Sequence, residues 1–309
     1  ISWTRALKQE LAKERHLTFD ANCLTPSLYR PFTKQWLYFN RRLNEMVLLM
    51  PSLFPEASSK NVAICASGVG SRSFSVLIVD SLPCLDNIEK GQCFPLYLYD
   101  DIDADEADAP QTGFFASPVS SVRARRDAIT DPGLAHFQSA FLGATISKED
   151  VFYYVYGLLH SPDYRERYAD NLSKELPRIP RVKNATDFWA FSKAGRELAE
   201  LHLNYETVAM HAGAKIDSGG KTLTDADFRV EKMKYGKRGK DKDLTTLIYN
   251  AKITVTGIPL EAYDYVVNGK PALDWVVERQ CVKTDKDSGI VNDANDWAID
   301  TMNNPRYPL

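Results

Sequence analysis

The spacing of hydrophobic residues changes along the chain. In the first hundred positions, short runs of β-branched and aromatic residues alternate with turn residues, a pattern typical of strands. Before these runs, apolar residues at four-residue spacing predict an amphipathic helix. The expected elements are a helix within 1–20, a hairpin over 27–40 with its turn at 33–35, and strands at 61–66, 74–79 and 94–99. The first third is therefore predicted to be β-rich.

Helical spacing replaces this pattern after residue 127. The expected helices cover 133–143, 148–160, 163–176 and 185–203. Ser147 with Asp150 predicts a capping box, and Pro162 after Ser161 predicts a helix start. Strands are expected again at 228–235, 244–249 and 251–257, and a helix at 271–280. This order favours an α+β fold over a doubly wound parallel sheet.

The length of 309 residues favours two subdomains over a single hydrophobic core. Six acids crowd the nine residues 100–108, and such a run is typical of a solvated loop. We place the boundary at this loop. The predicted subdomains are a β-rich one over 1–126 and a helical, mixed α/β one over 127–309.

Charge is distributed unevenly. The six acids of the loop turn a balance of +3 over the rest of the chain into the net charge of −3. Residues 229–242 hold seven basic residues against Glu231 and Asp241. Because a phosphate backbone responds to local rather than total charge, this stretch is a candidate contact for nucleic acid.

Five cysteines without a CxxC pair indicate buried thiols in a reducing compartment rather than a structural zinc site. The sequence shows no apolar run long enough to span a bilayer and no signal peptide, so we expect a cytoplasmic protein without a membrane partner. The chain begins at Ile1, which suits a fragment of a longer polypeptide.

Catalytic motifs are missing from the sequence. Gly220-Lys221-Thr222 resembles the end of a P-loop, but Lys215 stands where the first glycine belongs. No Lys has an acid two residues before it, as a common Mg²⁺-dependent nuclease requires, and Asn304-Pro-Arg-Tyr307 departs from the loop of an amino-group methyltransferase. We therefore expect no catalytic residue, no metal site and no cofactor in this chain.

Three segments together resemble one family. They are 29–45 (YRPFTKQWLYFNRRLNE), 151–168 with 176–180 (VFYYVYGLLHSPDYRERY and LPRIP), and 275–279 with 287–295 (WVVER and DSGIVNDAN). Their order and spacing are similar to the C-terminal specificity domain of type ISP (type I single-polypeptide) restriction–modification enzymes. The resemblance implies double-stranded DNA as the partner. It also implies that a nuclease, a translocase and an adenine methyltransferase, with their ATP, Mg²⁺ and S-adenosylmethionine, lie in the same polypeptide outside this chain.

A recognition domain must contact phosphates and base edges. The sequence predicts phosphate contacts at a hairpin around Gly236–Gly239 and, as a second group, in the first third. The candidate DNA-binding residues are Lys232, Lys234, Lys237, Arg238, Lys240 and Lys242, then Lys34, Arg41, Arg42 and Arg72. Gln35, Asn40 and Asn250 are nearby polar residues that could read bases. The alternative is a structural or protein-interaction coupling module of a phage-defence complex, without base readout.

Overall fold

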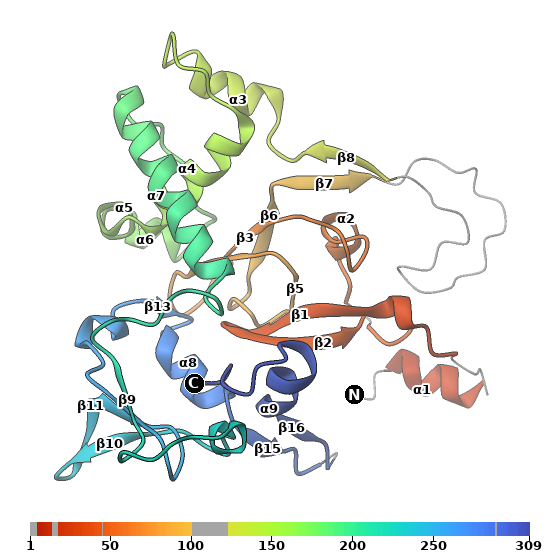
Figure 1. Ribbon diagram of the computed structural model, residues 1–309. Helices are drawn as coiled ribbons and strands as arrows, with labels where there is room; N and C mark the ends of the chain where they lie inside the picture. The colour runs from red at the N-terminus through yellow and green to blue at the C-terminus, as the bar shows by residue number, and fades with distance from the viewer. Residues whose placement is uncertain (1–4, 14–17, 45, 101–122, 288) are drawn as a thin grey trace. The chain divides into compact units, whose positions relative to one another are not determined.

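The computed structural model describes residues 5–13, 18–44, 46–100, 123–287 and 289–309 (Figure 1). The chain forms two compact units, one of residues 1–29 and 34–203 and one of residues 30–33 and 204–309. This division differs from the boundary predicted at 126/127, which falls inside the first unit. Most of the acidic segment lies outside the described residues.

The first unit combines three small sheets with a group of helices (Figure 1). Its strands are β1 (Leu24–Arg30), β2 (Thr33–Tyr38), β3 (Ala63–Ala66), β4 (Val76–Val79), β5 (Leu82–Pro83), β6 (Gln92–Pro95), β7 (Tyr97–Asp100) and β8 (Ala124–Asp127). Its helices are α1 (Arg5–Ala12), α2 (Met50–Leu53), α3 (Asp131–Gln138), α4 (Lys148–His160), α5 (Pro162–Arg167), α6 (Ala169–Leu172) and α7 (Ala185–Leu203). The strand orders are β2-β1-β5, β4-β3-β6 and β7-β8.

The antiparallel sheet β4-β3-β6 and the helices behind 127 share one core. Every residue of β3 and β4 is buried, which explains why these strands read as apolar runs rather than as alternating patterns. Ile64 and Ile78 of this sheet pack in one cluster with Phe188 of α7 and with α4. The helices therefore belong to the same unit as the strands, although the hydrophobic period changes between them.

The α4–α7 pair packs backbone against backbone. A Cβ atom at Gly195 would lie 2.0 Å from the carbonyl oxygen of Tyr153, and one at Gly157 would lie 2.3 Å from that of Phe191. Real Cβ atoms do not approach so closely. Glycine at 157 and 195 is what permits the helices to lie this near, with Tyr154 stacked on Phe188 at 4.9 Å between ring centroids.

Local signals predicted these helices well. The bounds of α4 and α7 agree with the predicted 148–160 and 185–203. The capping box is confirmed, since the Ser147 hydroxyl accepts from the Asp150 N–H at 3.1 Å and the Asp150 carboxylate accepts from the Ser147 N–H at 2.9 Å. Ser161 likewise caps α5, which begins at Pro162 as predicted. The predicted helix 163–176 is divided into α5 and α6.

Two strand predictions in this unit are wrong in detail. The run 94–99 is divided between β6, which pairs with β3, and β7, which pairs with β8. The hairpin turns at Pro31 and Phe32 rather than at 33–35, and Phe32 has a φ of 56°. Burial of the Phe32 ring, 5.3 Å from that of Tyr205, offsets the cost of this backbone conformation.

The segment 151–180 organises the first unit internally. The Tyr154 hydroxyl donates to the Pro180 carbonyl at 2.6 Å, and the Tyr164 hydroxyl donates to that of Arg178 at 2.8 Å. Arg165 donates from Nε to the Leu159 carbonyl at 2.7 Å, which closes the turn between α4 and α5. These side chains hold the segment 176–180 against the helices.

A buried histidine pair lies between β4, α4 and α7. The Tyr156 hydroxyl accepts from the Ile78 N–H at 3.1 Å, so its proton points to Nδ1 of His202 at 2.6 Å. The His160 Nδ1 lies 2.9 Å from the Tyr156 carbonyl and donates to it. Burial lowers the pKa of His160 to about 4 and that of His202 to about 3, so both imidazoles are neutral in the folded protein.

This pair predicts a loss of stability on acidification. The unfolded chain binds protons near the ordinary histidine pKa of about 6.5, whereas the folded pKa values are lower. The contribution of the two neutral histidines to the free energy of unfolding is therefore present above pH 6.5 and is lost as the pH drops from there toward 4. The expected loss between pH 7 and 5 is about 3 kcal/mol. Denaturant titrations of His202→Asn, which keeps an acceptor for Tyr156, should show a flatter pH profile. His136→Gln, at an exposed position, should leave the profile unchanged; an identical profile for wild type and His202→Asn would contradict the assignment.

The second unit is built on the sheet β10-β11-β12-β9. Its strands are β9 (Lys215–Asp217), β10 (Lys234–Arg238), β11 (Asp241–Ile248), β12 (Thr254–Thr256), β13 (Val266–Val267), β14 (Lys270–Pro271), β15 (Val282–Thr284) and β16 (Val291–Asp293). Its helices are α8 (Ala272–Arg279) and α9 (Ala294–Asp296), the latter continued by a π-helix at Trp297–Thr301. Blocks of helices thus alternate with small sheets, which are antiparallel apart from the parallel pair β1 and β5, and the predicted α+β class is confirmed.

The core of this unit joins the sheet to α8. It contains Tyr249 and Ile253, both fully buried, with Leu273 and Val277 of α8 packed against it. The closing motif of the sequence supports it: the Asn295 amide accepts from the Val230 N–H at 2.9 Å and donates to the Val230 carbonyl at 2.8 Å. The Asn295 side chain thus bonds both backbone groups of Val230, as a neighbouring strand would, in the segment that leads into β10.

Candidate nucleic-acid interface

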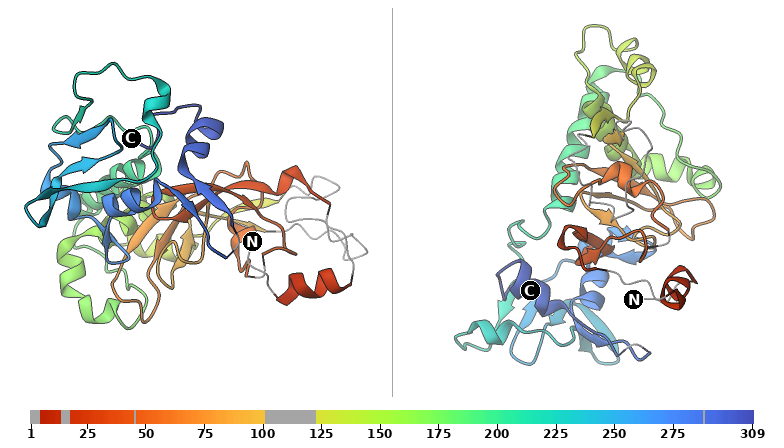
Figure 2. Two further views of the ribbon diagram at one scale, coloured as in Figure 1. Left: turned by 90° about the horizontal axis from the view of Figure 1, so that it is seen from below. Right: turned by 90° about the vertical axis from the view of Figure 1, so that its right-hand side faces the viewer.

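The hairpin β10–β11 carries the first group of predicted DNA-binding residues. Its turn consists of Gly239 and Lys240, between the opposed residues Arg238 and Asp241. Gly239 has a φ of 66°, which glycine adopts without strain. Gly236, predicted in the turn, lies inside β10 instead. Figure 2 shows the hairpin in cyan, with its turn at the end of the sheet.

The base of the hairpin is anchored to the unit. The Tyr235 hydroxyl donates to the Asp274 carboxylate of α8 at 2.5 Å, and burial of the ring, reinforced by this bond, raises the pKa of Tyr235. Between Tyr235 and Gly236 the partner on β11 changes from Leu247 to Asp243, which makes a bulge. The anchored base holds the charged tip in a defined direction.

Asp243 shapes the bulge. Its carboxylate accepts from the Thr245 hydroxyl at 2.6 Å, from the Thr245 N–H at 3.1 Å and from the Thr246 hydroxyl at 3.2 Å. These bonds, those of Thr245 first, lower the pKa of Asp243, so it stays ionised. The negative charge of Asp243 is thus stabilised by hydrogen bonds from Thr245 and Thr246 within the bulge.

The bulge and the strand period distribute the basic residues over two faces. Side chains two apart on a strand share a face, so Lys237 lies on the face of Tyr235. Lys242 is opposite Lys237, and its Nζ lies 5.7 Å from the centre of the Tyr235 ring. Arg238, opposite Asp241, lies on the other face together with Asp243. One face therefore joins two lysines, and the other mixes both signs of charge. Two lysines directly opposite each other are unfavourable in a sheet, because like charges repel.

The predicted cations of this stretch are all exposed: Lys232, Lys234, Lys237, Arg238, Lys240 and Lys242. In the part of the chain that the structure describes, none of these six forms an ion pair. Arg229, at the start of the basic stretch, differs, because it pairs with Glu231 at 2.8 Å and with Asp293 at 2.7 Å. Arg229 is a structural residue, and the six others are available to an anionic partner.

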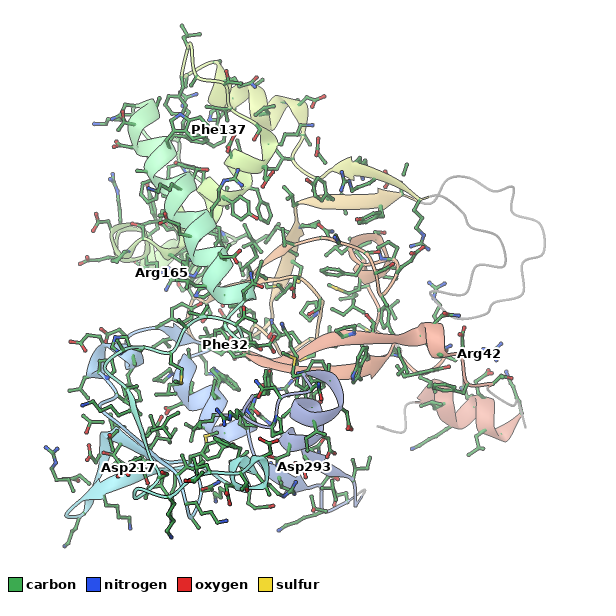
Figure 3. The ribbon with its side chains drawn as sticks, viewed as in Figure 1. Phe32, Arg42, Phe137, Arg165, Asp217 and Asp293 are labelled. Carbon is green, nitrogen blue, oxygen red and sulfur yellow. The ribbon has the colours of Figure 1, made fainter. Side chains whose placement is uncertain are left out.

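The second predicted group is not gathered in one place. Lys34 is the second residue of β2, whereas Arg41 and Arg42 follow its far end; Figure 3 shows Phe32 and Arg42 at opposite ends of the hairpin. Arg72 donates from Nε to Glu89 at 3.2 Å. Bonds from Arg72, its backbone N–H first, lower the pKa of Glu89. The structure therefore offers no compact cationic site formed by these four residues.

Among the polar residues considered for base reading, Asn250 already uses its side chain in hydrogen bonds to the backbone. The Asn250 amide donates to the carbonyls of Asp227 and Arg229 at 2.8 and 3.0 Å. Its oxygen accepts from the N–H groups of Lys252 and Ile253. Asn250 is thus the corner of a turn. Trp36 of β2 is 53% exposed, because it faces outward from the strand.

The sequence analysis missed a basic strand. Arg123, Arg125 and Arg126 follow the acidic segment, and all residues of β8 are exposed. The Arg125 guanidinium lies 4.2 Å above the Tyr97 ring, and Arg126 pairs with Asp100. Arg125, Arg126 and Lys148, which pairs with Asp127 and Asp131, line a hollow of about 590 Å³. The signal in the sequence is the run of three arginines at 123–126.

The described residues hold no cluster of three or more side chains suited to a metal ion. Nor does any helix among them have the length and apolarity that crossing a membrane requires.

Solved structures similar to this chain contain DNA. LlaBIII, described as an ATP-dependent Type ISP restriction-modification enzyme bound to DNA, is 35% identical, with a TM-score of 0.82 over 100% of this chain and 18% of that one. A nuclease-deletion mutant of LlaGI, a Type ISP enzyme in complex with a DNA substrate mimic, is 37% identical, with a TM-score of 0.77 over 100% of this chain and 21% of that one. A DrdV–DNA complex is 34% identical, with a TM-score of 0.75 over 93% of this chain and 26% of that one.

The chain spans about a fifth of the length of the LlaBIII chain and of the LlaGI mutant chain. No curated protein matches the sequence. Residues 1–309 match the family described as the Type ISP C-terminal specificity domain. On this match and the identities above, the chain belongs to the family of Type ISP C-terminal specificity domains.

Proposed function

We propose that this chain recognises a specific sequence of double-stranded DNA as the target-recognition domain of a restriction–modification polypeptide. The observation that carries the proposal is its similarity, over the whole chain, to specificity domains of enzymes whose structures contain DNA. The hairpin β10–β11 supports it, because its exposed cations form no ion pair among the described residues. Phosphates of the duplex would supply those partners.

The rest of the polypeptide would carry the chemistry. Nuclease, translocase and adenine methyltransferase domains would use ATP, Mg²⁺ and S-adenosylmethionine, and this chain would set where they act. Since such a polypeptide acts on DNA inside the cell, we place it in the cytoplasm. A coupling module without base readout is the competing function, and DNA binding separates the two.

A salt titration with selected duplexes tests the proposal. The whole chain is mixed with a library of random duplexes, bound DNA is recovered and sequenced, and affinity for the recovered motif is measured between 0.05 and 0.2 M salt. We expect a shared motif and, for about six phosphate contacts, a slope of log K against log [salt] near −5. Binding without any shared motif, or no binding even at the lowest salt, would favour the coupling module.

A further inference from the structure

We propose that Cys65 and Cys93 are a site of reversible oxidation, at which hydrogen peroxide converts two thiols into a cross-strand disulfide between β3 and β6. Both are free thiols, and their Sγ atoms lie 2.9 Å apart. The two cysteines are 28 positions apart in the sequence and are brought together by the sheet. This inference does not depend on DNA binding.

The strand register places the two residues in the arrangement that a disulfide needs. Cys65 is directly opposite Cys93. Leu96 donates its N–H to the Val62 carbonyl at 2.8 Å, so the pair 62–96 is hydrogen-bonded. Hydrogen-bonded and non-hydrogen-bonded pairs alternate along an antiparallel ladder. The pair 65–93 lies three positions from 62–96 and is therefore a non-hydrogen-bonded pair. In such pairs the Cα atoms lie about 4.5 Å apart, inside the range of disulfides, about 4.4 to 6.8 Å.

Small side-chain rotations suffice to form the bond. A disulfide joins its sulfurs at about 2.05 Å, so the two Sγ atoms must approach by less than 1 Å. Pro95 of β6 lies opposite Ala63 at the other non-hydrogen-bonded pair, where its missing N–H costs nothing. The backbone can keep its ladder while the thiols react.

The environment of the two thiols assigns them different roles. Cys65 is 2% exposed and lies opposite the buried Leu77 on the other side of β3. The hydrogen bond with Cys93 and burial raise the pKa of Cys65, so it stays protonated. Cys93 is half-buried on the outer strand β6 and is the sulfur that peroxide reaches first. Cys65 is then the resolving thiol.

The reaction balances with peroxide as the oxidant. The Cys93 sulfur attacks one peroxide oxygen, the O–O bond breaks, and a sulfenic acid and one water form. The Cys65 sulfur then attacks the Cys93 sulfur; the S–S bond forms, the S–O bond breaks, and the Cys65 proton leaves with the hydroxyl as a second water. Two thiols lose two electrons, and a dithiol reductant reverses the change.

Peptide mapping of the oxidised chain tests the site. The whole chain is treated with hydrogen peroxide, remaining thiols are alkylated, and the digest is analysed by mass spectrometry with and without dithiothreitol. We expect one peptide pair linking Cys65 to Cys93, about 2 Da lighter than the sum of its reduced peptides and absent after reduction. Because the bond closes a long loop, the unfolding temperature should rise by roughly 5 °C and return on reduction.

Two variants make the result decisive. In Cys65→Ser the resolving thiol is missing, so Cys93 should stop at the sulfenic acid, detectable with a dimedone adduct, or at higher oxides. Cys281→Ser, at a half-buried cysteine of the second unit, should give the same linked pair as the wild type. Oxidation of Cys93 beyond sulfenic acid in the wild type without a linked pair would overturn the proposal. So would a link from Cys93 to any other cysteine.

Discussion

Replacing Gly195 with alanine is expected to destabilise the first unit by about 3 kcal/mol or more, although alanine favours helices. The new Cβ would meet the Tyr153 carbonyl oxygen at 2.0 Å and the Gly157 nitrogen at 2.8 Å. Both are backbone atoms of α4 and cannot rotate away. The helices must separate, which opens the core around the buried Phe188. Denaturant and thermal unfolding measure the change, which corresponds to a fall of roughly 10 °C.

Ala194→Val is the matched control for this substitution. It adds two carbon atoms to the same helix, but at an exposed position, so only the weaker helix propensity of valine applies. We expect a loss of less than about 1 kcal/mol. If Gly195→Ala unfolds within about 0.5 kcal/mol of the wild type, glycine does not set the distance between α4 and α7.

Removing the charge at the hairpin tip is expected to weaken DNA binding for all sequences alike. In the triple variant Lys237→Ala, Arg238→Ala, Lys240→Ala, three phosphate contacts are lost, and the salt slope should flatten by about 2 to 3 units. At 0.1 M salt such a change in slope corresponds to roughly 100- to 1000-fold in affinity. Fluorescence titrations at several salt concentrations, with target and unrelated duplexes, measure both quantities.

A charge-matched triple controls for the lost charge. Lys8, Lys13 and Lys60 are exposed residues of the first unit, and replacing them with alanine lowers the net charge equally. This control should retain most of the affinity and slope. Should the hairpin variant bind like the wild type, the tip is solvated surface. The phosphate contacts would then be sought at Lys34, Arg41, Arg42 and Arg72.

The two faces of the hairpin can be compared directly. Lys237→Gln with Lys242→Gln removes the two opposed lysines, and Lys234→Gln with Arg238→Gln removes the same charge from the face that carries Asp241 and Asp243. Because these acids repel phosphate, we expect the first pair to cost more affinity than the second. Equal losses would show that the DNA contacts the tip as a whole.

Local chemistry determined a large part of the fold. The helices α4 and α7 follow from apolar spacing, caps and the absence of breakers within a few turns, and so their bounds were predicted from the sequence. The turn was predicted over Gly236–Gly239, whereas the structure has a two-residue turn at Gly239 and Lys240. In residues 228–249, β-propensity and charge both predict a hairpin, but they do not determine its register. The register depends on Asp243 and Thr245 in the opposite strand.

The cations of the hairpin β10–β11 can be read from the sequence, but their arrangement in space cannot. The sequence by itself determined that six cations follow Arg229 and which family the chain resembles. Only the tertiary structure decided that Arg229 is bound by Asp293 and that Lys237 faces Lys242. It also joined the helices after 127 to the strands before it. Spacing and capping are local interactions that a sequence displays, whereas strand pairing, bulges and packing depend on residues distant in the chain, whose contacts the local pattern does not specify.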